Sequence, residues 1–330
     1  MALAGGFTAG GARAITADQV KVKVGLYSIT YLGLWYRGRA LTHAELIERA
    51  RKFGYEGIEI DGKRPHGNPL DMPRKKCEEI RKRAEEAGVP IYAVAANNDL
   101  SSPIPEHRES QLVYLRELIR MAANLGVKVV RVFAAWRGVT VVPPPRGGGR
   151  YDIAIKVWNT AHEPFSPEQT WDWCRQGLIE AARWAGDHGI TLALQNHVPV
   201  VNGYRDMLRM IREVDSPHLK ACLDAPLLKN RDEASIREVA RAVGSLQVLS
   251  HFGYEQRPDG TIVKPGTFYK PFVRAMAGIG YSGYIGYELC HPLPVIGGRT
   301  VGIDYVDKNA RQAAEFMHGV IAEVKKEAAT

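Results

Sequence analysis

Four polar residues in the second half of the chain each stand at the end of a short apolar run: Gln195, Asp224, His251 and Glu288. If these runs are parallel strands of one barrel, the four side chains meet at the same rim, because parallel strands all end on one side. An amide oxygen, two carboxylates and an imidazole make a donor set suited to a divalent cation. The pattern therefore predicts a metal site, with Mn²⁺ as the preferred ion and Mg²⁺, Co²⁺ or Zn²⁺ as alternatives.

A recurring unit along the chain indicates how these residues are positioned. An amphipathic segment ends near a glycine and is followed by an apolar run, as where Ala84–Gly88 precedes Ile91–Ala95. A glycine that closes a helix just before a strand is typical of αβ turns. Eight such strands begin near residues 22, 57, 90, 127, 190, 219, 246 and 284. They predict an α/β fold, a single (β/α)8 TIM barrel, in preference to an open nucleotide-binding sheet, since no GxGxxG follows the first strand.

The spacing of the strands also predicts the domain organisation. The fourth and fifth strands are the farthest apart, and the stretch between them contains the Pro/Gly-rich segment Val141–Gly149. In a barrel this long loop after strand 4 leaves the catalytic rim, where it acts either as a lid or as a docking surface. We expect residues 1–20 to form a flexible N-terminal arm, without the features of a signal peptide, and residues 21–330 to form the barrel.

Composition excludes several classes of function. The chain has 330 residues, 45% of them hydrophobic, and a net charge of +8. This charge indicates a basic surface or, alternatively, a face for an acidic partner; no basic block interleaved with aromatic residues predicts nucleic-acid binding. No apolar stretch reaches the roughly 20 residues that span a bilayer. The four cysteines form no CxxC pair, which is typical of reduced thiols in a cytoplasmic protein.

The strand-end residues also carry a resemblance to a known superfamily. The elements Gln195-Asn-His197, Leu223-Asp224, His251 and Tyr287-Glu288 resemble the xylose-isomerase-like barrels, which include sugar isomerases, ketose epimerases and inosose dehydratases. The resemblance extends from about Lys21 to Lys325 and implies that the four strand-end residues hold the metal. Relatives usually have Glu at the position of Gln195. An amide cannot act as a general base, so this chain lacks one of the two carboxylates that shuttle a proton in a ketose epimerase.

The missing carboxylate directs attention to His197, which we predict to be catalytic together with Glu288. In an extended strand His197 faces the same side as Gln195. A hydrogen-bonding prop is the alternative role for this histidine. Other residues predicted near the rim, for which capping or packing is the alternative role, are proposed to bind the substrate: Asp61, His66, Asn98, Arg131, Trp136, His162, Tyr254 and His291.

A narrower resemblance involves the Gln-Asn-His run, residues 57–66 and the long fourth loop. These segments are similar to the catalytic α subunits of C-glycoside deglycosidases. The resemblance implies a metal-dependent lyase that forms an enolate from a 3-oxo-C-glycoside and releases the aglycone. It also implies a small β subunit as partner, beside which we expect self-association of this chain. The alternatives are a ketose isomerase or 3-epimerase and, in a different class, a non-catalytic binding or scaffold subunit.

Overall fold

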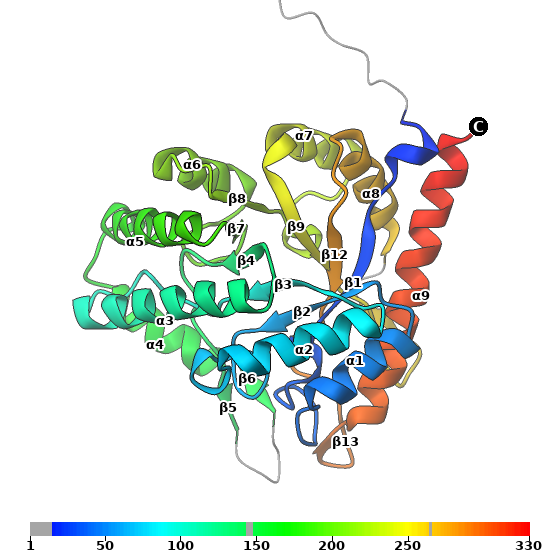
Figure 1. Cartoon of the computed structure of the whole chain (residues 1–330), viewed down its shortest axis with the longest axis horizontal. Helices are drawn as coiled ribbons and strands as arrows, with labels where there is room; N and C mark the ends of the chain where they lie inside the picture. The colour runs from blue at the N-terminus through cyan, green and yellow to red at the C-terminus, as the bar shows by residue number, and fades with distance from the viewer. Residues whose placement is uncertain (1–14, 143–147, 264–265) are drawn as a thin grey trace, which may run out of the picture.

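Eight parallel strands form a closed barrel in the order β1-β12-β9-β8-β7-β4-β3-β2 (Figure 1). The structure, a computed structural model, describes residues 15–142, 148–263 and 266–330. The predicted (β/α)8 barrel is confirmed, and each strand begins within two residues of its predicted start. The barrel strands are β1 (Lys23–Tyr27), β2 (Gly57–Asp61), β3 (Ile91–Ala95), β4 (Val129–Val132), β7 (Thr191–Gln195), β8 (Leu219–Cys222), β9 (Gln247–Phe252) and β12 (Tyr284–Tyr287).

Helices surround the barrel and cover the outer faces of its strands (Figure 1). This cover on the outside, with a filled barrel inside, explains why the strands are apolar along most of their length. The ring consists of α1 (His43–Lys52), α2 (Arg74–Glu86), α3 (Pro105–Asn124), α5 (Pro167–Asp187), α6 (Tyr204–Val214), α7 (Glu233–Val243), α8 (Tyr269–Gly278) and α9 (Ile303–Ala328). Short 3-10 turns supplement it: η1 (Ala17–Gln19), η2 (Ser28–Tyr31), η3 (Pro69–Asp71), η4 (Ala225–Leu227), η5 (Gly244–Leu246) and η6 (Gly266–Phe268).

Local sequence signals set the ends of several helices. Thr42 caps α1 in a capping box with Glu45, and Ser166 caps α5 in the same way with Gln169. At the other end of a helix, the predicted glycine caps are present. Gly126, after α3, has a φ of +74°, a left-handed conformation that favours glycine and ends the helix before the next strand.

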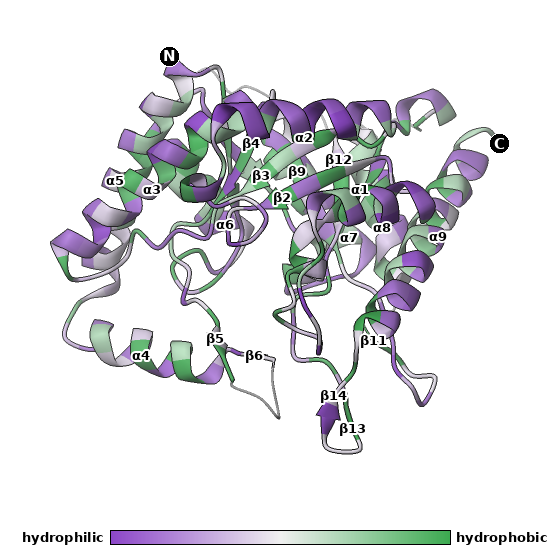
Figure 2. Ribbon diagram, turned by 60° about the horizontal axis from the view of Figure 1, so that its bottom comes forward, coloured by the Kyte–Doolittle hydropathy of each residue, from purple (hydrophilic) through white to green (hydrophobic). Residues whose placement is uncertain are grey.

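Additional elements extend beyond the carboxyl ends of the barrel strands (Figure 2). The stretch between β4 and β7, predicted as a loop, contains a hairpin and a helix of its own. Residues 143–147, which include the three prolines of the predicted loop, lie outside the described residues. The elements of this rim are α4 (Asp152–His162) and the hairpins β5–β6 (Thr140–Val141, Gly149–Arg150), β10–β11 (Glu255–Gln256, Ile262–Val263) and β13–β14 (Val295–Ile296, Arg299–Thr300).

The start of the described chain is folded onto the barrel. Residues 1–14 of the predicted arm lie outside the described residues. Of the remainder, η1 contacts α9, and Val20 is buried in the core. Among the described helices, none combines the length and the apolar character that a membrane span requires.

The amino-terminal end of the barrel is filled by the ring of Tyr92. The register between β2 and β3 shifts at this point, and Tyr92 is the extra residue. Its ring occupies the space left by glycines on three other strands, where an added Cβ would lie within 3 Å of Tyr92: Gly25, Gly57 and Gly286. These glycines are therefore required by the close approach of an aromatic ring.

Candidate active site

A connected set of buried polar side chains lies inside the barrel and centres on Arg131 of β4. Its Nε donates to Glu59 at 3.2 Å, Nη1 donates to Oε1 of Gln195 at 2.6 Å, and Nη2 donates to the Tyr27 hydroxyl at 2.7 Å. Burial alone would lower the pKa of Arg131, but Tyr27 and Glu59 outweigh it and raise the pKa well above its ordinary range. Each nitrogen of this cation therefore already has a buried acceptor.

His251 of β9 lies between two carboxylates. Its Nδ1 is 2.7 Å from Asp224 Oδ1 and its Nε2 is 2.7 Å from Glu59 Oε2, and all three residues are fully buried. Burial alone would lower the pKa of His251, but the two carboxylates outweigh it and raise the pKa well above its ordinary value. Conversely, burial alone would raise the pKa of Asp224, but His251 and Arg131 outweigh it and lower the pKa below its ordinary value. The imidazole is thus fixed in orientation from both sides.

The amide of Gln195 is oriented by opposite requirements at its two ends. Its oxygen accepts from Arg131, and its Nε2 donates to Asp224. Because a guanidinium only donates and a carboxylate only accepts, this amide orientation is the one that satisfies both neighbours. Asn196 supports the same carboxylate residue, since its Oδ1 accepts from the backbone N–H of Asp224 at 2.7 Å.

Asp61, a predicted substrate-binding residue, is buried in the same network. It accepts from the Tyr27 hydroxyl, from Asn97 Nδ2 at 3.0 Å and from the backbone N–H of Lys63 at 2.8 Å. These bonds connect the ends of β1, β2 and β3. The carboxylate therefore also organises the rim, in line with the capping role that was the alternative for Asp61.

His197 is positioned by a turn after β7 and not by the extended strand that was predicted. β7 ends at Gln195, and the backbone N–H of His197 donates to the Gln195 carbonyl at 2.8 Å, so the chain has turned before His197. Its Nδ1 lies 2.5 Å from the carbonyl oxygen of Val198, which can only accept; Nε2 therefore carries the lone pair. Burial and the nearby Arg131 lower the pKa of His197 to about 4. The imidazole is a neutral group able to accept a proton at Nε2.

A cavity of about 230 Å³ opens at the carboxyl ends of the barrel strands and contains both predicted catalytic residues. Arg131, Gln195, His197 and Glu288 form part of its polar lining. Glu288 is half-buried, and among the described residues no hydrogen bond or ion pair engages its carboxylate. Nε2 of His197 is likewise without a described partner. Two groups that can exchange protons therefore face one cavity.

The outer walls of this cavity are aromatic. Phe133 and Trp136 stack with ring centroids 5.0 Å apart, and the His197 ring lies edge-on to both at 5.1 Å. On another side, Trp35 and Tyr151 contact each other at 5.1 Å. The cavity therefore combines a polar floor with walls suited to a flat or apolar group.

The metal-binding capacity of the site comes from Asp224, His251 and their neighbours. Ligand atoms of Cys222, Asp224 and His251 lie within 4.8 Å of one another. Burial raises the pKa of Cys222 to about 12, which keeps its sulfur protonated when no ion is bound. Glu59 contacts the far nitrogen of His251, an arrangement that is usual for the carboxylate behind a metal-binding histidine.

Of the other predicted substrate-binding residues, two line the cavity and five do not. Arg131 and Trp136 line it. Asn98 is buried and supports the rim, because it donates to the carbonyl of Phe133 at 2.6 Å. The remaining four do not line this cavity. His66 bonds to the carbonyl of Leu41, His162 to that of Ser101, Tyr254 stacks on Phe316, and His291 bonds to Glu255.

Among the members of the buried network that sequence reasoning did not propose as site residues are Tyr27 and Glu59. Glu59 had a signal, because it alternates with Asp61 in β2 and must share its inward face. Tyr27 ends β1 among apolar residues, and nothing in its local sequence distinguishes it from a core aromatic.

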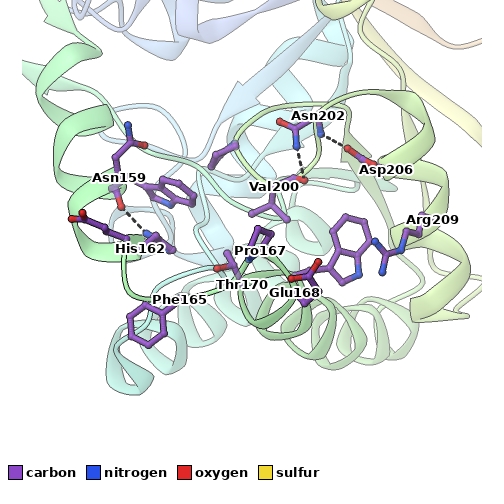
Figure 3. Close-up of a pocket in the computed structure, with 14 residues that line it drawn as sticks. Asn159, His162, Phe165, Pro167, Glu168, Thr170, Val200, Asn202, Asp206 and Arg209 are labelled. Atoms are coloured by element: carbon purple, nitrogen blue, oxygen red, sulfur yellow. Dashed lines mark hydrogen bonds between the residues drawn. The ribbon is translucent and has the colours of Figure 1, made fainter.

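A second cavity, of about 510 Å³, lies outside the barrel between α4, α5 and α6 (Figure 3). His162, which was predicted to bind substrate, lines this cavity together with Val200 and Asp206. It is larger than the cavity at the barrel mouth, but it lacks the Arg131 network and the two catalytic candidates. We therefore place the candidate active site at the barrel mouth.

Comparisons with known proteins agree with this fold. The profile of a family described as "Xylose isomerase-like TIM barrel" matches residues 47–318, and no curated protein gives a match. D-psicose 3-epimerase from Clostridium cellulolyticum H10, solved with D-tagatose, has a TM-score of 0.66 at 19% identity, covering 91% of this chain and 99% of that chain. The 3-keto-D-glucoside 4-epimerase from E. coli has a TM-score of 0.65 at 19% identity, covering 91% and 100%. At these identities, the similarity shows a common fold.

Proposed function

Because this chain belongs to the xylose isomerase-like TIM barrel family, we propose that it is a sugar isomerase or epimerase acting beside the ketone of a keto-sugar. One observation carries the proposal: His197 Nε2 and the Glu288 carboxylate, both without described partners, face the same cavity. A reaction of this class removes a proton from the carbon next to a carbonyl and returns it elsewhere. Two such groups supply one base to take the proton and one acid to deliver a proton from a different side, as an epimerisation needs.

The two groups approach the cavity from different strands. His197 follows β7 and Glu288 follows β12, and β8 and β9 separate these strands in the barrel. In the proposed reaction His197 Nε2 takes the proton as the C–H bond breaks, and the electron pair moves into the enolate. Glu288, which must enter this step as the carboxylic acid, delivers its proton to a carbon of the enolate from another side, and proton exchange with water returns both groups to their starting states. Gln195 takes no part in proton transfer, because an amide is not a base.

The residues present fit a divalent cation. A ring of His251 that binds an ion through Nδ1 is neutral, so the four carboxyl groups Glu59, Asp61, Asp224 and Glu288 face only two cations, Arg131 and Lys63, and a divalent ion would offset this excess. Asp224, His251 Nδ1, the Gln195 oxygen and Glu288 are the proposed ligands, with Glu59 holding the ring of His251. When bound, the ion supplies polarisation of the ketone oxygen. Mn²⁺ is the preferred ion for this thiolate-free donor set.

The solved structures with the same fold support a keto-sugar substrate. Their names describe a D-psicose 3-epimerase, an L-ribulose 3-epimerase and a 3-keto-D-glucoside 4-epimerase. The last name describes a glycoside that carries its ketone on the sugar ring, and a proton is removed beside such a ketone as readily as beside that of a free ketose.

A second candidate is the carbon–carbon lyase that releases the aglycone of a 3-oxo-C-glycoside. Two observations favour it. Gln195 removes a carboxylate from the site, and Trp35, Phe133, Trp136 and Tyr151 give the cavity walls that fit an aromatic aglycone better than a small free sugar. This reaction begins with the same enolate. Its electron pair then displaces the aglycone carbon, which leaves with the electrons of the broken bond and takes up a proton, so the sugar carbon is not reprotonated.

One experiment separates these readings. The metal-loaded protein is incubated in D₂O with D-fructose, with a 3-keto-glucoside and with a 3-oxo-C-glycoside, and the products are followed by NMR and mass spectrometry. Deuterium at the carbon beside the ketone, together with a new epimer or isomer, supports the proposed function. Aglycone release supports the lyase. If neither deuterium nor product appears with any of the three, both enzymatic readings fail and a binding or scaffold role remains.

A further inference from the structure

Lys63 places a cation at the barrel mouth that none of the interactions described above employs. It follows β2 and lines the same cavity as His197 and Glu288. Its backbone is held in place, because its N–H donates to Asp61 Oδ1 at 2.8 Å and its carbonyl accepts from the N–H groups of His66 and Gly67 at 3.0 Å each. The start of the side chain is thus fixed at the rim.

The ammonium group itself has no acceptor. Among the described residues, none forms a hydrogen bond or ion pair with Lys63 Nζ, which lies 5.8 Å from the centroid of the Trp136 ring. Arg131 differs in this respect, because all three of its nitrogens donate to buried acceptors. Lys63 is therefore the cation of the described cavity lining that has its donors available.

We propose that Lys63 contacts the substrate and donates to the oxygen that becomes negatively charged during enolisation. The inference rests on the proposed function. As the C–H bond breaks, its proton goes to His197 Nε2 and its electron pair becomes the enolate, whose charge is concentrated on the former ketone oxygen. Lys63 keeps its own protons and binds that oxygen. A half-buried cation positioned before the reaction stabilises such charge without reorganising.

This role differs from a packing role in what it predicts. If Lys63 only packs against Trp136, replacing it should change the affinity for neutral and anionic ligands equally. If Lys63 binds an oxyanion, replacing it should weaken the affinity for an anionic mimic of the enolate far more than the affinity for a neutral ketose, because hydrogen bonds to charged groups are the stronger ones.

The test compares Lys63→Met, which keeps the length of the chain but removes the charge, with Lys63→Arg, which keeps the charge. Lys128→Met is the matched control, since Lys128 is an exposed lysine just before β4, at the opposite end of the barrel. Isothermal titration calorimetry of each metal-loaded variant measures the affinity for D-fructose and for an aldonohydroxamate, an anionic mimic of the enediolate. Thermal melting verifies that each variant is folded.

We expect Lys63→Met to lose about tenfold or more in hydroxamate affinity and about threefold or less in D-fructose affinity, the former being the typical effect of a lost charge-assisted hydrogen bond. Lys63→Arg should recover part of the loss, and Lys128→Met should match the wild type. Equal losses for both ligands, no loss for either, or a wild type that does not bind the hydroxamate would each overturn the proposal. If the wild type shows no enolisation in D₂O but the selective loss occurs, the proposed function fails while the oxyanion contact stands.

Discussion

Glu59 and Asp224 contact the two ring nitrogens of His251, so the orientation of this imidazole does not depend on a ligand. His197 is held differently, by one bond to a neighbouring carbonyl and by aromatic rings, with Nε2 left open. The two histidines of the site therefore suit different tasks. One is built into a charged network next to the proposed ion, and the other faces the cavity as a neutral base.

This difference leads to a prediction about metal content. Asp224→Ala and His251→Ala should lose the divalent ion, because each removes a proposed ligand. His197→Ala should keep the ion and lose turnover, since among the described residues its ring bonds to the carbonyl of Val198 and packs against Phe133 and Trp136. Elemental analysis of the purified variants beside the D₂O exchange assay measures both properties. Loss of the ion from His197→Ala alone would reverse the assigned roles, and an ion-free, fully active wild type would eliminate the site.

A second prediction at this scale concerns Glu59, a positioning residue that touches His251 from behind. Glu59→Gln keeps the size of the side chain but weakens its hold on Nε2. We expect metal affinity to fall by about 10- to 100-fold, the usual cost of losing such a carboxylate. Competition with a chelator dye measures this affinity, with the exposed Glu79→Gln on α2 as control. Unchanged affinity in Glu59→Gln would show that Glu59 serves only to balance Arg131.

At the scale of single elements, the barrel depends on strands that carry glycine where Tyr92 needs room. A Cβ added at Gly25 would lie 2.4 Å from the Tyr92 hydroxyl, whereas one added at Gly319 in α9 meets nothing within 4 Å. Gly25→Ala should therefore lower the free energy of unfolding by about 1–3 kcal/mol through overpacking. Gly319→Ala should be neutral or raise it by about 0.5–1 kcal/mol, because alanine favours helix.

Urea unfolding of both variants tests this packing argument. If the ring of Tyr92 causes the cost, Gly25→Ala should be better tolerated in a Tyr92→Leu background, and the two substitutions should not be additive. Additive effects would mean that Gly25 is needed for its backbone and not for the space beside Tyr92.

The contact between the start of α1 and the loop after β2 should respond to acid. His43 Nε2 bonds to the carbonyl of His66, and burial lowers the pKa of His43 from 6.5 to about 4. Between these values the unfolded chain binds a proton that the folded protein does not. The stability from His43 is thus complete above about pH 6.5 and is lost as the pH falls towards 4.

We expect this effect to reduce the free energy of unfolding by on the order of 2 kcal/mol across that interval. Denaturant titrations at several pH values measure it, and His43→Gln should flatten the dependence while keeping a donor towards His66. The exposed His107→Gln serves as the control. An unchanged pH dependence in His43→Gln would mean that another buried group controls acid stability.

At the scale of the whole molecule, the rim exposes large apolar side chains beside the cavity. Val141, Val157, Val295 and Ile296 are 65%, 64%, 52% and 57% exposed, and they belong to β5, α4 and β13. Large apolar side chains that are exposed on one rim can mark a surface for protein–protein contact. We propose that a small β subunit covers this rim and that the chain also associates with a second copy of itself.

Light scattering of the chain alone and co-expressed with a candidate small subunit tests the assembly. Val157→Asp and Ile296→Asp should weaken association without altering the fold, because both side chains already face solvent. The exposed Val113→Asp on α3, away from the rim, should leave association unchanged. A fully active monomer of 36.5 kDa would end the proposal.

The sequence by itself determined the repeated strands and helices, their glycine caps and the polar residues at the strand ends. These features are local, since a glycine with positive φ or an apolar run acts through its immediate neighbours, and the barrel follows once eight such units are joined. The sequence also placed Gln195, Asp224 and His251 at one rim, where the structure brings them into one buried network.

Only the tertiary structure decided how that network is connected. Glu59 and His251 are separated by 192 positions, and they meet because the closed barrel turns residues of distant strands towards one interior. The same closure gives Arg131 its acceptors on three other strands. The turn after β7 places His197 at the cavity. Four other predicted residues lie in segments that do not line the cavity: His66, His162, Tyr254 and His291. Residue type and spacing show which side chains can do chemistry. Which of them touch depends on contacts between strands that no local pattern records.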